Sequence, residues 1–213
     1  MNLPNKLTCL RMLLVPILVV VAYLPIDALD NTCGYIPIRY LILLAIFCIA
    51  SLTDYFDGKI ARKKNLITTF GKFLDPIADK LLVVASLLVL VEPHGAVPAI
   101  IPAWIVIITE ARELLVAASR MLQAKKGNVV AASWYGKVKT VSQMTAIILA
   151  FLCVSPFFAF VNGPEAEAFK SGGMVQFVLN ILMSIAMCVA LIASVFSGWD
   201  YIKASKDEIL ESK

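Results

Sequence analysis

Long apolar stretches recur along almost the whole chain, and each is about as long as the hydrocarbon core of a membrane is thick. About 20 apolar residues in a helix cross a bilayer. The composition agrees, because 60% of the 213 residues are hydrophobic and the mean hydropathy is +0.85, which is too apolar for a soluble domain. The sequence predicts an all-α, polytopic membrane protein of one domain over residues 1–213, with six transmembrane helices near residues 7–25, 37–62, 71–91, 98–122, 134–154 and 175–201.

The basic residues predict how these helices are oriented. Six spans place both ends of the chain on one side of the membrane. Only Arg39 and Lys170, of 19 Lys and Arg residues, fall on the other side, in connections 24–38, 92–97 and 155–174. Because Lys and Arg are enriched in cytoplasmic loops, we expect both termini on the cytoplasmic side of the inner membrane. A net charge of +4 that arises in this way does not indicate nucleic-acid binding.

The first residues have a pattern of their own. Leu3, Leu7 and Leu10 recur at near-helical spacing beside Lys6 and Arg11. This pattern is typical of a short helix that lies in the membrane interface, and we expect one there. A plain start of the first membrane span explains it equally well.

Four aspartates interrupt the apolar pattern near the cytoplasmic ends of the second and third spans. Asp54 and Asp57 are three residues apart, and Asp75 and Asp79 are four apart, so each pair lies on one face of a helix. Asp54 and Asp79 each lie eight residues from the cytoplasmic end of their span, which is about 12 Å. The two pairs can therefore meet at one depth.

Carboxylates at this depth need a cation or water, because an ionised group is costly in a bilayer. Hard oxygen ligands favour Mg²⁺, Mn²⁺ or Ca²⁺ over zinc, and the sole histidine, His94, lies on the opposite side. Four carboxylates suffice for two ions, which assist displacement at phosphorus. The alternative is ion pairing with Arg62, Lys59 or Lys72.

Small and basic residues next to the aspartates favour a phosphate-handling site. Gly58 follows Asp57 although glycine weakens a helix, so a ligand can approach the backbone there, beside the small Ala61. Arg62 can bind a phosphate with its forked guanidinium. Gly71 opens the third span, where free backbone N–H groups favour an anion.

Together these residues resemble the signature of the CDP-alcohol phosphatidyltransferases, D-x-x-D-G-x-x-A-R-x8-G-x-x-x-D-x-x-x-D. Every fixed position is present, as Asp54, Asp57, Gly58, Ala61, Arg62, Gly71, Asp75 and Asp79. The resemblance implies a homodimeric enzyme in which an alcohol displaces CMP from CDP-diacylglycerol.

The resemblance also implies a role for each signature residue. Asp54, Asp57 and Asp75 would bind two Mg²⁺ or Mn²⁺ ions. Asp79 would be a shared ligand or the base that takes the proton from the attacking hydroxyl, and Arg62 would hold the pyrophosphate. The CDP group would lie close to the backbone at the three small residues, Gly58, Ala61 and Gly71.

A second polar cluster, Thr109 to Glu113, interrupts the fourth span at about the depth of the aspartates. Its Arg112, with Arg120, Lys137 and Lys139 near the cytoplasmic ends of spans four and five, predicts a cationic pocket. A phosphate monoester needs several cations, whereas a neutral or zwitterionic acceptor such as serine does not. These residues therefore favour a phosphorylated alcohol as the acceptor.

This second cluster also has a plainer explanation. Arg112 could pair with Glu110 or Glu113, and the lysines could serve only to set the topology.

Three further stretches, Asn2–Arg11, Thr109–Leu114 and Ala131–Thr140, resemble bacterial members of the family that use glycerol 3-phosphate. Their resemblance implies a nucleotide side lined by Asn5, Thr8 and Arg11. It implies an acceptor-phosphate site made by Arg112, Arg120 and Lys137. The loops 26–38 and 155–173 match nothing we know.

Two other functions remain open from the residues. The same chemistry can use inositol phosphate, serine or phosphatidylglycerol as the acceptor. A divalent-cation transporter also places aspartates inside the membrane, although here they cluster at one face and the outward halves of the spans carry almost no polar path.

Overall fold

The computed structural model describes most of the chain. Described are residues 3–64, 69–95, 97–125, 134–162 and 173–210. Within these ranges the backbone alone is described at residues 3–6, 55–64, 69–73, 75–76, 122–125, 162 and 204–210.

Six long helices make up most of the described residues, and each overlaps one predicted span. They are α1 (Leu3–Tyr23), α2 (Ile38–Lys64), α3 (Thr69–Val91), α4 (Ala103–Lys125), α5 (Trp134–Cys153) and α8 (Met174–Leu210). The shorter elements are the 3₁₀ turn η1 (Asp27–Leu29), the helix α6 (Ala159–Asn162) and an antiparallel hairpin of β1 (Thr32–Cys33) and β2 (Ile36–Pro37). The all-α class is therefore confirmed.

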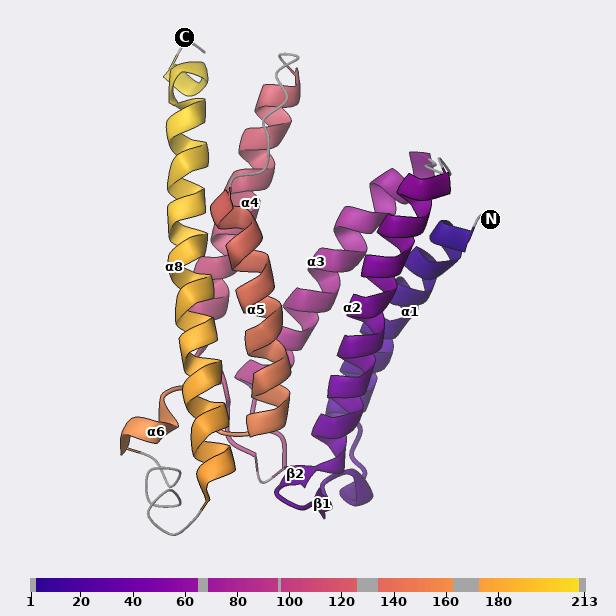
Figure 1. The fold of residues 1–213 in the computed structure, drawn as a ribbon, viewed down its shortest axis with the longest axis vertical. Coiled ribbons are helices and arrows are strands. Elements are labelled where there is room, and N and C mark those ends of the chain that lie inside the picture. Colours follow the sequence, from indigo (N-terminus) through magenta and orange to yellow (C-terminus); the bar gives the residue numbers. More distant parts are fainter. Residues whose placement is uncertain (1–2, 65–68, 96, 126–133, 163–172, 211–213) are drawn as a thin grey trace.

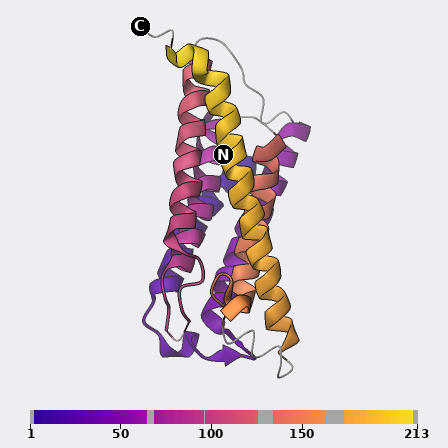
Figure 2. The ribbon, with the colours of Figure 1, turned by 90° about the vertical axis from the view of Figure 1, so that its left-hand side faces the viewer.

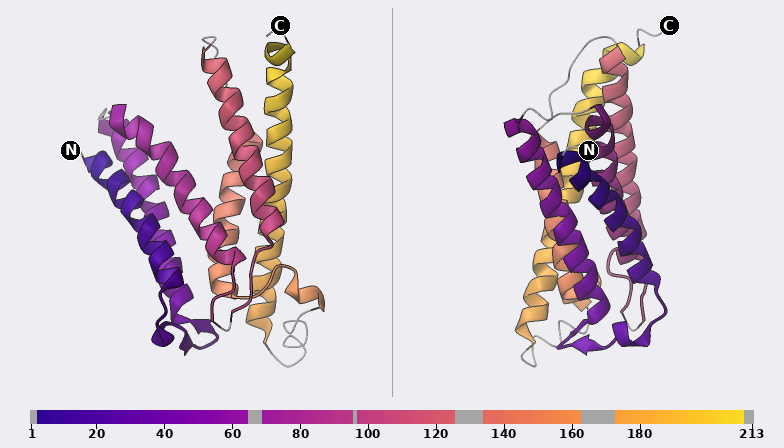
Figure 3. Two further views of the ribbon diagram at one scale, coloured as in Figure 1. Left: turned by 180° about the vertical axis from the view of Figure 1, so that it is seen from behind. Right: turned by 90° about the vertical axis from the view of Figure 1, so that its right-hand side faces the viewer.

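The long helices form two groups (Figure 1). In one group α1 packs against α2 and α3, and in the other α8 packs against α4 and α5. Contacts of α2 with α5 and of α3 with α4 join the groups. Seen from behind, α3 and α4 diverge towards the end that holds both termini, whereas the hairpin and α6 lie at the other end (Figure 3). The predicted site residues lie towards the end where the helices diverge.

The core joins the two groups through aromatic contacts, while the outside of the bundle is apolar. The ring of Phe151 lies 6.2 Å from that of Tyr40 and 6.3 Å from that of Phe47, measured between centroids. Large apolar side chains such as Ile107 and Leu114 are exposed. Exposed apolar surface of this extent is typical of a protein in contact with lipid.

Two described helices are long and apolar enough to cross a membrane, namely α5 and the Met174–Lys203 part of α8; the apolar part of α1, Leu7–Tyr23, is shorter. These helices indicate a membrane protein. At 37 residues α8 is longer than a bilayer requires, and it runs at an angle to α4 (Figure 2). The six-span topology stays a prediction.

Two details of the prediction are wrong. The first residues do not form a separate interfacial helix, because α1 is continuous from Leu3 to Tyr23; Leu3, Leu7 and Leu10 belong to this helix. The fourth helix begins at Ala103 rather than near residue 98. It is preceded by Pro102, which cannot donate a backbone hydrogen bond and disfavours helix in the residue before it.

Arg39 fastens the end of α1 to the start of α2. Its side chain donates hydrogen bonds of 3.0, 2.9 and 2.9 Å to the carbonyl oxygens of Val21 and Ala22 in the last turn of α1 and of Leu24 just after it. Two further bonds, of 2.8 and 3.2 Å, reach the carboxylate of Asp30. These bonds from Arg39 hold the pKa of Asp30 below its ordinary value. One buried guanidinium therefore satisfies several carbonyls that a helix end leaves without donors.

Replacing Arg39 with methionine is expected to lower the thermal unfolding midpoint in detergent by several degrees. Each carbonyl oxygen that loses its donor costs about 1–3 kcal/mol if it stays buried, whereas the ion pair itself adds little because 37% of the Asp30 side chain is exposed. Arg39→Lys keeps the charge but not the forked guanidinium group, so its unfolding midpoint should lie between those of the wild type and Arg39→Met. An unchanged midpoint for Arg39→Met would show that these contacts contribute nothing to stability.

Candidate active site

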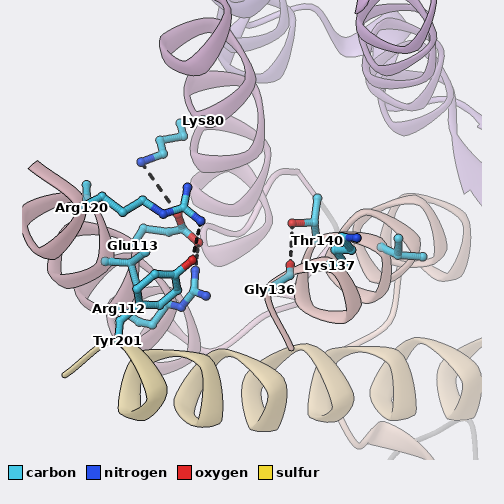
Figure 4. Close-up of a pocket in the computed structure, with 11 residues that line it drawn as sticks. Lys80, Arg112, Glu113, Arg120, Gly136, Lys137, Thr140 and Tyr201 are labelled. Carbon is cyan, nitrogen blue, oxygen red and sulfur yellow. Dashed lines mark hydrogen bonds and ion pairs between the residues drawn. The ribbon is translucent and has the colours of Figure 1, made fainter. Parts of the chain in front are cut away.

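A cavity of about 780 Å³ lies where α4, α5 and α8 meet (Figure 4). All three predicted acceptor cations line it. Arg112 and Arg120 come from α4, and Lys137 comes from the first turn of α5. The other lining residues are Lys80, Glu113, Val116, Ala117, Gly136, Thr140, Val141 and Tyr201. In Figure 4 the two arginines gather with Tyr201 on one side, and Lys137 lies with Gly136 and Thr140 on the other.

Glu113 forms ion pairs with three cations at one end of this cavity. Its Oε1 lies 2.6 Å from Nη1 of Arg112 and 2.8 Å from Nζ of Lys139, and its Oε2 lies 3.8 Å from Nζ of Lys80. The pairing of Arg112 with Glu113, which the sequence left open, is therefore present. The larger cavity is lined by four cations, Lys80, Arg112, Arg120 and Lys137, against the single carboxylate of Glu113, and this excess of positive charge suits an anionic ligand.

A smaller cavity of about 80 Å³ adjoins the first one and contains Asp79. Lys80, Glu113 and Thr140 line both cavities. The other residues of the smaller cavity are Val83, Val84, Glu110, Lys139, Gln143 and Met144. Asp79 on α3 is thus a neighbour of the acceptor cations on α4 and α5, although the two clusters are far apart in sequence.

Asp54 is held by an arginine that the sequence did not pair with it. Nη1 of Arg11 lies 2.9 Å from Oδ1 of Asp54, and Nε of Arg11 donates a 3.4 Å hydrogen bond to the carbonyl oxygen of Ala50. Arg11 is 0% exposed, whereas 43% of the Asp54 side chain remains accessible. The expected alternative partners Arg62, Lys59 and Lys72 have side chains outside the described part. The contact fixes the position of Asp54 and leaves room for a ligand beside it.

Two of the four aspartates can be placed in detail. Asp54 on α2 pairs with Arg11, and Asp79 on α3 lines the smaller cavity. The helices α2 and α3 contact each other, and hard oxygen donors such as these carboxylates fit Mg²⁺ or Mn²⁺. Among the side chains that the structure describes, no three His, Cys, Asp or Glu residues form a metal-binding group.

For most of the other predicted residues, the structure describes the helix to which they belong but not the side chain. Asp57, Gly58, Ala61 and Arg62 belong to α2, Gly71 and Asp75 to α3, and Asn5 to α1, in stretches where only the backbone is described. Thr8 is described and buried on α1, one turn before Arg11. The roles of all these residues stay predictions.

Two residues of α8 contact the acceptor cations, which the sequence does not predict. The hydroxyl of Ser197 accepts a hydrogen bond from Nη2 of Arg112, and the hydroxyl of Tyr201 accepts one from Nη2 of Arg120. Both residues lie in the last apolar span, where they resemble ordinary helix residues. The only signal in the sequence is their spacing with Ser194, which places all three polar side chains on one helical face.

Comparisons with known proteins place the chain among its relatives. The model of the CDP-alcohol phosphatidyltransferase family matches residues 1–199. A Bacillus subtilis protein named CDP-diacylglycerol–glycerol-3-phosphate 3-phosphatidyltransferase is 39% identical over 213 residues, which cover 99% of this chain and 98% of that protein. Proteins of the same name from Salmonella choleraesuis and Escherichia coli K12 are 43% and 40% identical over 148 residues, or 68% of this chain and 74% of theirs.

Proposed function

The chain belongs to the CDP-alcohol phosphatidyltransferase family, and on this premise we propose that it transfers the phosphatidyl group of CDP-diacylglycerol to glycerol 3-phosphate, giving phosphatidylglycerol phosphate and CMP. One observation carries the choice of acceptor: Arg112, Arg120 and Lys137 line one cavity that adjoins Asp79. Two or more cations around one cavity suit a phosphate monoester. The name of the B. subtilis relative agrees with this acceptor.

The proposed reaction is one displacement at phosphorus. The acceptor phosphate lies against Arg112, Arg120 and Lys137, which orient the glycerol hydroxyl towards the smaller cavity. Asp79 takes the proton of this hydroxyl, whose oxygen attacks the phosphorus that bears the diacylglycerol. The bond from that phosphorus to the bridging oxygen of the pyrophosphate breaks, and CMP leaves. Such a reaction depends mainly on positioning and on charge stabilisation.

The donor side of the site is proposed from the signature. Asp54, Asp57, Asp75 and Asp79 would hold two Mg²⁺ or Mn²⁺ ions, which when bound screen the charge on the attacking and leaving oxygens. Arg11 keeps the Asp54 carboxylate in place from α1. The CDP group would be bound by Asn5, Thr8, Arg11, Gly58, Ala61, Arg62 and Gly71.

The proposed enzyme is a homodimer in the inner membrane, crosses it six times and works at the cytoplasmic side. Both termini lie at the end of the bundle towards which α3 and α4 diverge (Figure 1), and most Lys and Arg residues belong to connections on that side.

The proposed function is tested by CMP release from CDP-diacylglycerol with a panel of acceptors. Purified protein in Mg²⁺ should release CMP with glycerol 3-phosphate and much more slowly with glycerol, serine, inositol phosphate or phosphatidylglycerol. Faster release with another acceptor would replace glycerol 3-phosphate by that alcohol. Metal flux into sealed vesicles without release of CMP by any acceptor would favour a cation transporter instead.

Substitution of Arg112 or Lys137 by alanine is expected to raise the KM for glycerol 3-phosphate roughly tenfold or more, because a charge-assisted hydrogen bond to the acceptor phosphate is lost. The KM for CDP-diacylglycerol should change little. The measurement is steady-state kinetics with each substrate varied in turn. Lys203→Ala is the matched control, since Lys203 is exposed on α8 and does not line the cavity. Equal effects on both substrates would contradict a dedicated acceptor pocket.

A further inference from the structure

One face of α8 contacts both arginines of the acceptor cavity. This face carries Ser194, Ser197, Gly198 and Tyr201, whose spacing of three, one and three residues is that of one side of a helix. All four are buried, and such spacing places them on the face of α8 that is turned to α4 and α5. We call Ser197, Gly198 and Tyr201 the α8 anchor. The signature quoted above, from Asp54 to Asp79, does not include these residues.

Tyr201 holds Arg120 in two ways. Its hydroxyl accepts a hydrogen bond from Nη2 of Arg120, and the guanidinium carbon of Arg120 lies 5.1 Å from the centroid of the tyrosine ring. A cation over an aromatic ring is attracted by the charge distribution of the ring. Tyr201 is 3% exposed, so its own position is fixed by packing. In Figure 4 the Tyr201 ring lies among Arg120, Arg112 and Glu113 on one side of the cavity.

Ser197 and Gly198 hold Arg112 in a similar manner. The Ser197 hydroxyl accepts a hydrogen bond from Nη2 of Arg112, while Glu113 binds Nη1. A Cβ atom on Gly198 would lie 3.1 Å from Cγ of Arg112, which is closer than an ordinary van der Waals contact. The absence of a side chain at position 198 therefore lets the stem of Arg112 lie directly against the α8 backbone.

We propose that the α8 anchor positions Arg112 and Arg120 for the acceptor phosphate and thereby determines the preference for a phosphorylated acceptor. An unrestrained arginine loses much rotamer entropy when it binds a ligand. Two arginines held in advance by one rigid helix lose less, and their separation is fixed before the acceptor arrives. This inference rests on the proposed function. Its residues act through the arginines and are positioning residues.

The test compares Tyr201→Phe, which keeps the ring and removes the hydroxyl, with Ser194→Ala on the same buried face. Ser194 makes no described hydrogen bond to either arginine. Tyr201→Phe should raise the KM for glycerol 3-phosphate roughly tenfold, because the charged guanidinium of Arg120 loses its hydrogen bond to the tyrosine hydroxyl. The KM for CDP-diacylglycerol should stay unchanged, and so should both constants in Ser194→Ala. These constants do not depend on how much of the protein is folded.

Specificity and coupling give two further readouts. The ratio of kcat/KM for glycerol 3-phosphate to that for glycerol should fall in Tyr201→Phe, because only the phosphorylated acceptor uses Arg120. In an Arg120→Ala background, Tyr201→Phe should have no further effect, since residues that act as one unit are not additive. Gly198→Ala should also raise the KM for glycerol 3-phosphate, because Arg112 must move.

The possible outcomes distinguish a failure of this proposal from a failure of the proposed function. If the wild-type protein neither binds nor uses glycerol 3-phosphate, both are overturned. If it uses this acceptor but Tyr201→Phe behaves as Ser194→Ala does, or acts equally in the presence and absence of Arg120, only the role of the α8 anchor is overturned. A selective rise in the KM for glycerol 3-phosphate that disappears in the Arg120→Ala background supports it.

Discussion

Asparagine in place of Asp79 is expected to lower kcat by roughly a hundredfold or more, because the substitution keeps the shape of the carboxylate and removes the general base. Asp79 suits this role since its cavity shares Lys80, Glu113 and Thr140 with the cavity of the acceptor cations. CDP-diacylglycerol should still bind. The measurement is kcat at saturating concentrations of both substrates, together with binding of the donor lipid.

The control for this substitution is Asp27→Asn, at an exposed position of η1 at the opposite end of the bundle. It should leave kcat unchanged. Weaker metal binding in Asp79→Asn would show that Asp79 is a metal ligand as well. Wild-type kcat in Asp79→Asn would remove it from the chemistry.

Chelation of divalent metal should abolish turnover completely, and Mg²⁺ or Mn²⁺ should restore it. The reason lies in the donor set. Asp54 and Asp79 lie on α2 and α3, two helices that contact each other, and the signature adds Asp57 and Asp75, so several like charges would gather in a site that needs a cation. The measurement is CMP release in excess EDTA and after addition of each metal. Full turnover in EDTA would exclude the metal-assisted reaction.

The helices could be predicted from the sequence because apolar length is a local property. Each of the six long helices overlaps a predicted span, since about 20 consecutive apolar residues have few other stable arrangements. The errors concern the helix ends, whose positions depend on individual residues. Pro102 delays the start of α4, and the first leucines simply extend α1. The hairpin between α1 and α2 has too few residues to give a periodic signal.

In the candidate site, too, features within one helix could be predicted from the sequence, whereas contacts between distant segments could not. Spacing within one helix predicted which aspartates share a face. Charge predicted one cationic pocket with Arg112, Arg120, Lys137 and Lys139, whereas the first three line the larger cavity and Lys139 lines the smaller one. Contacts between distant segments gave no such signal. Nothing in the sequence pairs Arg11 with Asp54, which lie on α1 and α2. Likewise, Tyr201 lies 81 residues after the arginine that it binds, so only the packing of α8 against α4 reveals the contact.

The product of the reaction tests the proposed activity most directly. Purified protein is mixed with CDP-diacylglycerol, Mg²⁺ and glycerol 3-phosphate labelled with carbon-13, and the lipids are identified by mass spectrometry. The proposed function predicts labelled phosphatidylglycerol phosphate and an equal amount of CMP. A lipid fraction without label, or CMP released by water or by another alcohol in place of glycerol 3-phosphate, would contradict it.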